Sequence, residues 1–222
     1  MNLVRFKFSR GDDLKYVSHL DQQKMFQRAF RRSGIPMAYS NGFNPHPKLS
    51  FAQAMAVGLT SDGEYGDVEL TADVKTDDFL SMINRELPNG YHVLSATMHH
   101  EKPRALNASI VKASYTVETL TEADEVSIQT EIISYLEQEE IEIEKRNKKK
   151  KIITMNIKPY LQEFSIRCIK NHVVTFDMTM RYIDQKTVSP SVLLASFEKE
   201  SGISFDSEQL WRVHRHELVL NE

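Results

Sequence analysis

Cysteine is almost absent from this chain, because Cys168 is the only one among its 222 residues. A single thiol excludes an internal disulfide framework of the kind found in small secreted proteins. It also excludes a three-cysteine iron–sulfur motif of the Cys-x3-Cys-x2-Cys type within the chain. Both absences fit a reducing compartment, and we therefore expect the protein to be cytoplasmic.

Long apolar runs are absent as well. A membrane-spanning helix needs roughly 18 consecutive apolar residues, and no stretch of the chain approaches that length. The N-terminal residues "NLVRFKFSR" alternate as in an amphipathic strand, so we expect no signal peptide. The sequence thus predicts a globular protein that does not enter a membrane.

The motifs of several common enzyme classes are missing. The eight glycines form neither a P-loop nor a G-x-G-x-x-G turn, and neither G-x-S-x-G nor H-E-x-x-H occurs. We therefore predict no cofactor and no metal site. Two histidine groups leave the question of a metal open: His99–His100, and His214 with His216. His214 and His216 are two residues apart in a predicted strand, so their side chains share one face and could bind one ion.

Positive charge is concentrated in the first quarter of the chain. Residues 1–50 contain nine lysines and arginines but three acidic residues, whereas the rest of the chain carries a net charge of −9. We interpret this asymmetry as an anion-binding surface. A chance excess of charge on solvated faces is the alternative.

The first hundred residues have the pattern β-α-β-β-α-β. The segment "LVRFKFS" alternates as a half-buried strand, and a helix is predicted from a Ser18 cap to Ser33, because Gly34 follows. Further along we expect a strand over "KLSFAQAMAVGL", a turn at "SDGEYG", a strand over "DVELTADV", a helix over "KTDDFLSMINREL" and a strand over "YHVLSATMHH".

The second half repeats this order with one addition. After the strand "SIVKASYTVETL" we expect a helix capped by Thr121, a hairpin in "EIEIEKRNKKKKIITMNI", two strands, a helix from Ser189 to Gly202 and the strand "LWRVHRHELVL". We therefore predict an α+β fold of two tandem ferredoxin-like (βαββαβ) units, the second with an inserted β-hairpin. The boundary is expected in "EKPRALNAS", which gives domains of residues 1–104 and 105–222.

Basic residues share one side of the predicted helix 18–33, opposite its apolar side. Such a stripe matches the phosphates of a nucleic-acid backbone, and a solvated helix face is the alternative. Basic residues of the first strand and one after the proline-rich loop extend this surface. The basic residues predicted here to contact nucleic acid are Arg5, Lys7, Lys24, Arg28, Arg31, Arg32 and Lys48.

The segment "SNGFNPHPKLSF" contains two prolines that bracket His46 and restrict the loop. A loop that only connects does not need such rigidity. Phe43 and His46 can stack on an unpaired base, and Asn44 can read a base edge. The alternative is a tight structural turn with Phe43 packed in the core.

Two histidines are candidate catalytic residues. The unperturbed pKa of imidazole, about 6.5, suits proton transfer at neutral pH, which makes His19 and His46 the acid/base candidates. For His19, a packed position at the helix start beside a capping Ser18 and Asp21 is the alternative. Asp21 is expected to point elsewhere, which argues against a catalytic pair with His19.

A run of basic residues lies in the predicted hairpin, where six of the seven residues from Lys145 to Lys151 are basic. The run can form an exposed arm that contacts RNA through Lys148, Lys149 and Lys150. It can equally balance the acidic strand "EEIEIE" across the hairpin.

The N-terminal third also resembles a known family. The segments "SHLD" (18–21) and "SNGFNPHP" (40–47), the three arginines of the helix, and Gly58, Ser61, Glu64 and Tyr65 resemble the bacterial domain of unknown function called radical SAM-linked protein. In that family the domain often follows, or is fused to, a radical SAM protein with a cobalamin-binding-like region. The resemblance implies an accessory role beside such an enzyme, and the family has no established activity.

Three functions remain open from the sequence. The first is an RNA-binding module, not itself an enzyme, that presents tRNA or rRNA to a radical SAM modification enzyme. The second is an RNA-processing or RNA-modifying enzyme that uses His19 and His46. The third is a protein–protein adaptor for the radical SAM partner.

Overall fold

The computed structural model describes residues 1–146 and 151–221. The predicted α+β class is confirmed. The elements are β1 (Asn2–Arg10), η1 (Asp12–Leu14), α1 (His19–Ser33), β2 (Leu49–Phe51), β3 (Leu59–Leu70), α2 (Thr76–Glu86), β4 (Tyr91–His99), α3 (Leu106–Ser109), β5 (Ile110–Leu120), α4 (Glu125–Glu137), β6 (Glu142–Arg146), β7 (Ile152–Asn156), η2 (Lys158–Tyr160), β8 (Leu161–Lys170), β9 (Val173–Arg181), α5 (Pro190–Ser201) and β10 (Asp206–Leu220).

The chain forms two compact units. Unit 1 comprises Met1–Ile110 and Arg215–Glu222, and unit 2 comprises Val111–His214. The predicted ranges, 1–104 and 105–222, differ from these units at two places, because residues 105–110 and the end of β10 belong to unit 1. The last strand therefore crosses from unit 2 back into unit 1, which the linear order of the elements does not reveal.

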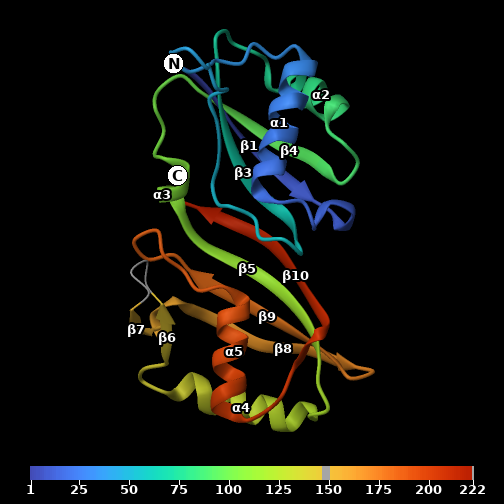
Figure 1. Ribbon diagram of the computed structural model, residues 1–222, viewed down its shortest axis with the longest axis vertical. Helices are drawn as coiled ribbons and strands as arrows, with labels where there is room; N and C mark the ends of the chain where they lie inside the picture. Colours follow the sequence, from blue (N-terminus) through green and yellow to red (C-terminus); the bar gives the residue numbers. More distant parts are fainter. Residues whose placement is uncertain (147–150, 222) are drawn as a thin grey trace. The chain divides into compact units, whose positions relative to one another are not determined.

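Unit 1 is built on an antiparallel sheet with the order β4-β1-β3, and β2 pairs with β3. Figure 1 shows α1 and α2 side by side in this unit. Helix α1 packs on β1 through aromatic rings: the Phe8 and Phe26 centroids are 4.9 Å apart, and those of Phe6 and Phe30 are 5.7 Å apart. All four rings are buried, as the alternation of β1 and the apolar side of the helix predicted.

Two predictions for residues 48–66 are wrong. The strand over "KLSFAQAMAVGL" is reduced to β2, and the turn at "SDGEYG" is the middle of β3. The two glycines allow neighbouring atoms to approach the β3 backbone closely. A Cβ on Gly63 would lie 2.9 Å from the Glu217 Cα, and one on Gly66 would lie 2.4 Å from the Phe6 ring. The glycines that suggested a turn instead make room for a neighbouring strand and a core side chain.

Unit 2 contains an antiparallel sheet with the order β5-β9-β8, and the predicted hairpin forms a separate two-stranded sheet, β6-β7. Its core includes Tyr135 of α4 and Phe197 of α5, whose ring centroids are 5.4 Å apart. Figure 1 shows the helices α4 and α5 of this unit. Helix α4 begins later than predicted, because Asp124 and not Thr121 accepts the capping hydrogen bond. The tandem ferredoxin-like assignment of the two units stays a prediction.

Charged side chains in unit 1 are buried only with partners. Arg215 donates to Glu64 at 2.6 Å, and both side chains are almost fully buried. Arg10, also buried, donates to the backbone carbonyl oxygens of Leu59, Ala56 and Val17. A buried charge without a partner costs several kcal/mol, so these contacts fix which strands lie together.

Across residues 1–146 and 151–221, no helix has both the length and the apolar character needed to cross a bilayer.

We predict that the substitution Arg215→Met lowers the free energy of unfolding by about 3–5 kcal/mol, because it leaves the Glu64 carboxylate buried and unpaired. Urea denaturation of the full chain measures this loss. The matched control is Arg167→Met, which breaks a partly exposed pair with Asp177 and should cost at most about 1 kcal/mol. Coincident denaturation curves for the two variants would contradict the prediction.

Candidate nucleic-acid interface

Helix α1 begins and ends where the sequence predicted. The Ser18 hydroxyl accepts from the Asp21 N–H at 3.2 Å and donates to the Asp21 carboxylate at 2.7 Å. This hydrogen bond, with the nearby charge of Lys24, lowers the pKa of Asp21. The helix ends at Gly34, whose φ of 74° lies in the left-handed region that glycine favours.

The basic side of α1 is exposed along its length, and two of its four charges have acidic partners. Lys24 lies 3.5 Å from Asp21, and Arg32 donates to Glu86 at 2.9 Å. Arg28 and Arg31 form no ion pair within the part of the chain that the structure describes, although the charge of Arg28 acts on Asp21 from a longer distance. The residues are three apart in a helix and so lie on the same side. They are the uncompensated part of the predicted stripe.

Arg5 does not fit its predicted role, because it is buried and not on an exposed strand face. Its guanidinium makes a bidentate contact with Asp67, with two hydrogen bonds of 2.9 Å, and donates to the Arg104 carbonyl oxygen at 3.0 Å. Burial of the side chain and its pairing with Asp67 keep Arg5 from a phosphate at the protein surface.

Lys7 and Lys48 are also engaged within unit 1. Lys7 donates to Glu217 at 2.8 Å and is mostly covered, while Lys48, which is exposed, donates to Glu69 at 2.6 Å. Glu217 and Glu69 therefore neutralise two of the positive charges that were predicted to form the anion-binding surface.

The proline-rich loop is closed at its base. The Ser40 N–H donates to the His46 carbonyl oxygen at 2.8 Å, and the His46 N–H donates to the Ser40 hydroxyl at 3.0 Å. A β-bridge between Tyr39 and Pro47 supports the same closure. The loop is therefore tied at both ends, as its prolines suggested.

The tip of this loop faces solvent. Phe43, Asn44 and His46 are all exposed, and Phe43 is as accessible as in an extended peptide. The alternative in which Phe43 fills the core is therefore wrong. Gly42 has a φ of 123°, so the turn before Phe43 uses a conformation that side chains disfavour.

The two candidate catalytic histidines have different surroundings. His19 is half-buried with its ring 6.0 Å from that of Phe51, and its Nδ1 has no hydrogen-bond partner among the described residues. His46 is exposed on the loop. The Asp21 carboxylate bonds to Ser18, as expected from its predicted direction, and pairs with Lys24.

The lysine-rich arm cannot be placed on this interface. Lys148, Lys149 and Lys150 lie outside the described residues.

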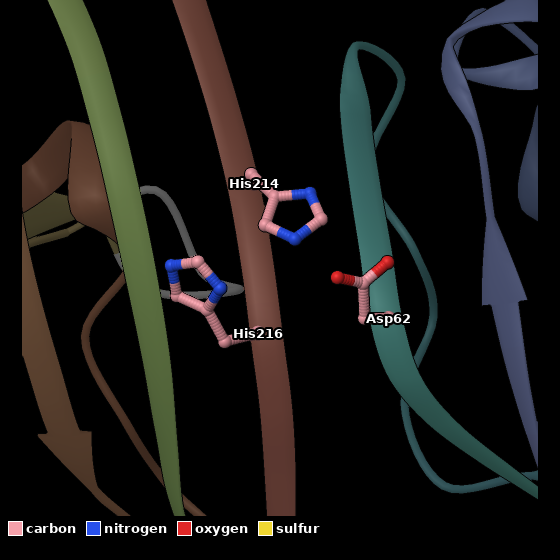
Figure 2. A group of neighbouring side chains, drawn as sticks. All are labelled: Asp62, His214 and His216. Atoms are coloured by element: carbon pink, nitrogen blue, oxygen red, sulfur yellow. The ribbon is translucent and has the colours of Figure 1, made fainter.

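A second group of chemically active side chains joins the histidine pair seen in the sequence to an aspartate that was missed. Figure 2 shows His214 and His216 on β10 and Asp62 on β3. Within unit 1, a carboxylate oxygen of Asp62 lies within 4.8 Å of a ring nitrogen of His216. His214 directly precedes unit 1 in the same extended strand, and so its side chain shares the face of His216.

Within unit 1, Asp62 and His216 together offer a carboxylate oxygen and an imidazole nitrogen, which are ligand types that a divalent transition metal accepts. The spacing of the histidines was visible in the sequence. The contribution of Asp62 was not visible in the sequence, because only the pairing of β3 with the end of β10 brings Asp62 close to His216.

Comparison with known proteins places the chain in a family. Residues 4–190 match the family described as "Uncharacterized protein conserved in bacteria (DUF2344)". The chain belongs to the DUF2344 family. This match covers most of the DUF2344 chain and confirms the predicted membership of a bacterial family of unknown function. The link to a radical SAM protein is not part of the match.

Two further comparisons add little about the DUF2344 chain. No curated protein matches it. A solved structure titled "Crystal Structure of a Cbf5-Nop10-Gar1 Complex" is similar at a TM-score of 0.48 and 10% identity, over 96% of this chain and 47% of that chain. The DUF2344 chain thus spans about half the length of the matched chain, and a likeness at this level carries no information on function.

We predict that Ser40→Ala speeds chymotrypsin cleavage after Phe43 about fivefold, because the loss of one hydrogen bond of about 1 kcal/mol lets the loop open more often. Limited proteolysis followed by mass spectrometry measures the rate at this bond. Ser95→Ala, a substitution of an exposed serine on β4, should leave the rate unchanged. Equal rates for the two variants would show that Ser40 does not restrain the loop.

Proposed function

We propose that this chain is an accessory RNA-binding module that holds tRNA or rRNA for a radical SAM modification enzyme. The observation that carries the proposal is the tied loop of residues 40–46, which presents Phe43 to solvent in full. An exposed aromatic ring on a restrained loop is held ready to stack on a planar partner.

An unpaired base is a suitable partner for this ring. Stacking of one base on an aromatic side chain contributes about 1–3 kcal/mol and tolerates any base, because every base has a π-face. The hydrogen bonds between Ser40 and His46 reduce the conformational entropy that the loop loses on binding. Asn44, exposed next to Phe43, can add a contact to a base edge.

The electrostatic contribution comes from fewer residues than the sequence suggested. Arg28 and Arg31 offer guanidinium groups without acidic partners in the described part of the chain, and Lys24 is only weakly engaged at 3.5 Å. Contacts of this kind with phosphates release counterions, and binding then weakens as salt rises. We infer that the protein contacts few RNA phosphates and that the affinity of these contacts falls as the salt concentration rises.

The proposal of an enzyme partner is based on the resemblance to radical SAM-linked proteins. The single Cys168 cannot provide a three-cysteine cluster motif, so the radical chemistry would belong to the partner. A role beside such an enzyme also implies the cytoplasm.

Catalysis by the chain itself has less support than binding. In an acid/base mechanism both groups must reach the same reacting atoms. His19 is packed against Phe51 and His46 stands on the exposed loop, and no contact joins them within residues 1–146 and 151–221.

An adaptor role has one observation in its favour. Tyr16, Leu20 and Val57 are large apolar residues that are mostly exposed in unit 1. The Gly58 N–H donates to the Lys15 carbonyl oxygen at 2.7 Å, which brings the segments of Tyr16 and Val57 together. This surface could contact the radical SAM protein while the loop holds RNA.

We predict that single-stranded RNA binds the full chain at low salt, and that Phe43→Ala weakens binding about tenfold through the loss of stacking. Fluorescence anisotropy with a labelled RNA measures the affinity. Tyr16→Ala, which removes another exposed aromatic ring of unit 1, should bind as the wild type does. No binding at low salt, or equal affinity for Phe43→Ala, would refute the proposed function.

The charged contacts have their own test. The double variant Arg28→Glu/Arg31→Glu should reduce the slope of log affinity against log salt by about 1.4, since each single-strand phosphate contact contributes about 0.7. Lys170→Glu/Lys199→Glu, which makes the same change in net charge on unit 2, should leave the slope nearly unchanged. Equal slopes for the two double variants would remove α1 from the interface.

A further inference from the structure

A cavity of about 410 Å³ lies entirely within unit 1. Its walls come from β2 and β3 and from the segment of residues 102–107 that follows β4. Arg5 fastens this segment, because the guanidinium that binds Asp67 also donates to the Arg104 carbonyl oxygen. The volume falls within the range of about 300–1,000 Å³ that is usual for small-molecule sites.

The charges around the cavity do not balance. Its two carboxylates are already paired: Asp67 with Arg5, and Glu69 with Lys48. Lys102 and Arg104 also line the cavity, are exposed, and have no acidic partner in the part of the chain that the structure describes. Two positive charges are therefore left over, which favours an anionic ligand.

The apolar part of the wall is fixed. Leu3 of β1 and Leu106 of α3, both buried, line this side of the cavity. The Phe51 ring lies on the other face of the sheet, because it packs with Phe8 and Phe26 at 5.5 and 5.3 Å between centroids, whereas Ser50 shares the face of Asp67. An aliphatic wall beside unmatched cations suits an anion with an apolar part more than a fully hydrated ion such as free phosphate.

The position of the cavity connects it with the tied loop. Strand β2 begins two residues after Pro47, the last residue of the bridge that closes the loop, and β2 supplies Ser50 and Phe51 to the cavity wall. An RNA strand stacked on Phe43 can thus extend along the chain toward this opening.

We propose that the cavity binds one unstacked nucleotide, with its base against Leu3 and Leu106 and its phosphate near Lys102 and Arg104. The assignment to an RNA strand rests on the proposed function, whereas the nucleotide specificity of the cavity stands on its charge and its apolar wall. Extruding a base costs little in single-stranded RNA, so a pocket of this kind adds selectivity for one nucleotide within a strand.

Nucleoside monophosphates test the cavity separately from the loop. In NMR titrations of the full chain, a nucleoside monophosphate should shift resonances of residues 102–107 and Leu3, and it should bind more tightly than either the nucleoside or inorganic phosphate. Lys102→Glu/Arg104→Glu should weaken this binding at least about tenfold, because it removes two charge-assisted contacts. Lys170→Glu/Lys199→Glu should leave it unchanged.

A second variant tests whether the loss of binding in Lys102→Glu/Arg104→Glu comes only from the change in net charge. Ser50→Trp places a large side chain at an exposed position on the cavity wall and should block the monophosphate while leaving the two cations in place. The cavity proposal is overturned if the monophosphate binds no better than inorganic phosphate, or if Ser50→Trp has no effect. Monophosphate binding without RNA binding would support the cavity and refute the proposed function, and the reverse would refute the cavity alone.

Discussion

The buried ion pair between Glu64 and Arg215 is the contact on which unit 1 depends. It joins residues 151 positions apart and ties the end of β10 to β3. Two buried charges are stable together but not apart, because each needs the other to replace the water it has lost. The pair therefore requires the C-terminal residues to return to unit 1, and it keeps "SDGEYG" in an extended strand although its composition is typical of a turn.

The same requirement for partners decides which basic residues are available to a ligand. The N-terminal quarter of the sequence is positively charged. A basic side chain that is paired with a carboxylate in the fold, however, attracts an external anion only weakly. Arg5 and Lys7 are paired within unit 1, and so is Lys48 at its surface. Arg28 and Arg31 of α1 remain, and Lys102 and Arg104, which the sequence analysis passed over, join them at the cavity. The anion-binding surface we propose is smaller than the charge count suggested and differently placed.

The loop and the cavity complement each other physically. The loop presents one ring that can stack on a base from outside, whereas the cavity offers the aliphatic side chains of Leu3 and Leu106 and two unmatched cations to a nucleotide that enters. Both are positioned by β2, a strand of three residues whose pairing with β3 fixes where the loop ends and the cavity wall begins. A module of this kind needs no catalytic group of its own to select a nucleotide for a partner enzyme.

The sequence by itself determined the local structure, because caps, periodicity and prolines act over a few residues. Ser18 and Gly34 bound α1, Ser189 and Gly202 bound α5, and the alternation of β1 buries Phe6 and Phe8, all as predicted. Only the tertiary structure decided which charges meet. The burial of Arg5, the pairing of Glu64 with Arg215 and the approach of Asp62 to His216 all depend on strands distant in sequence, and composition cannot show which partner a buried charge will find.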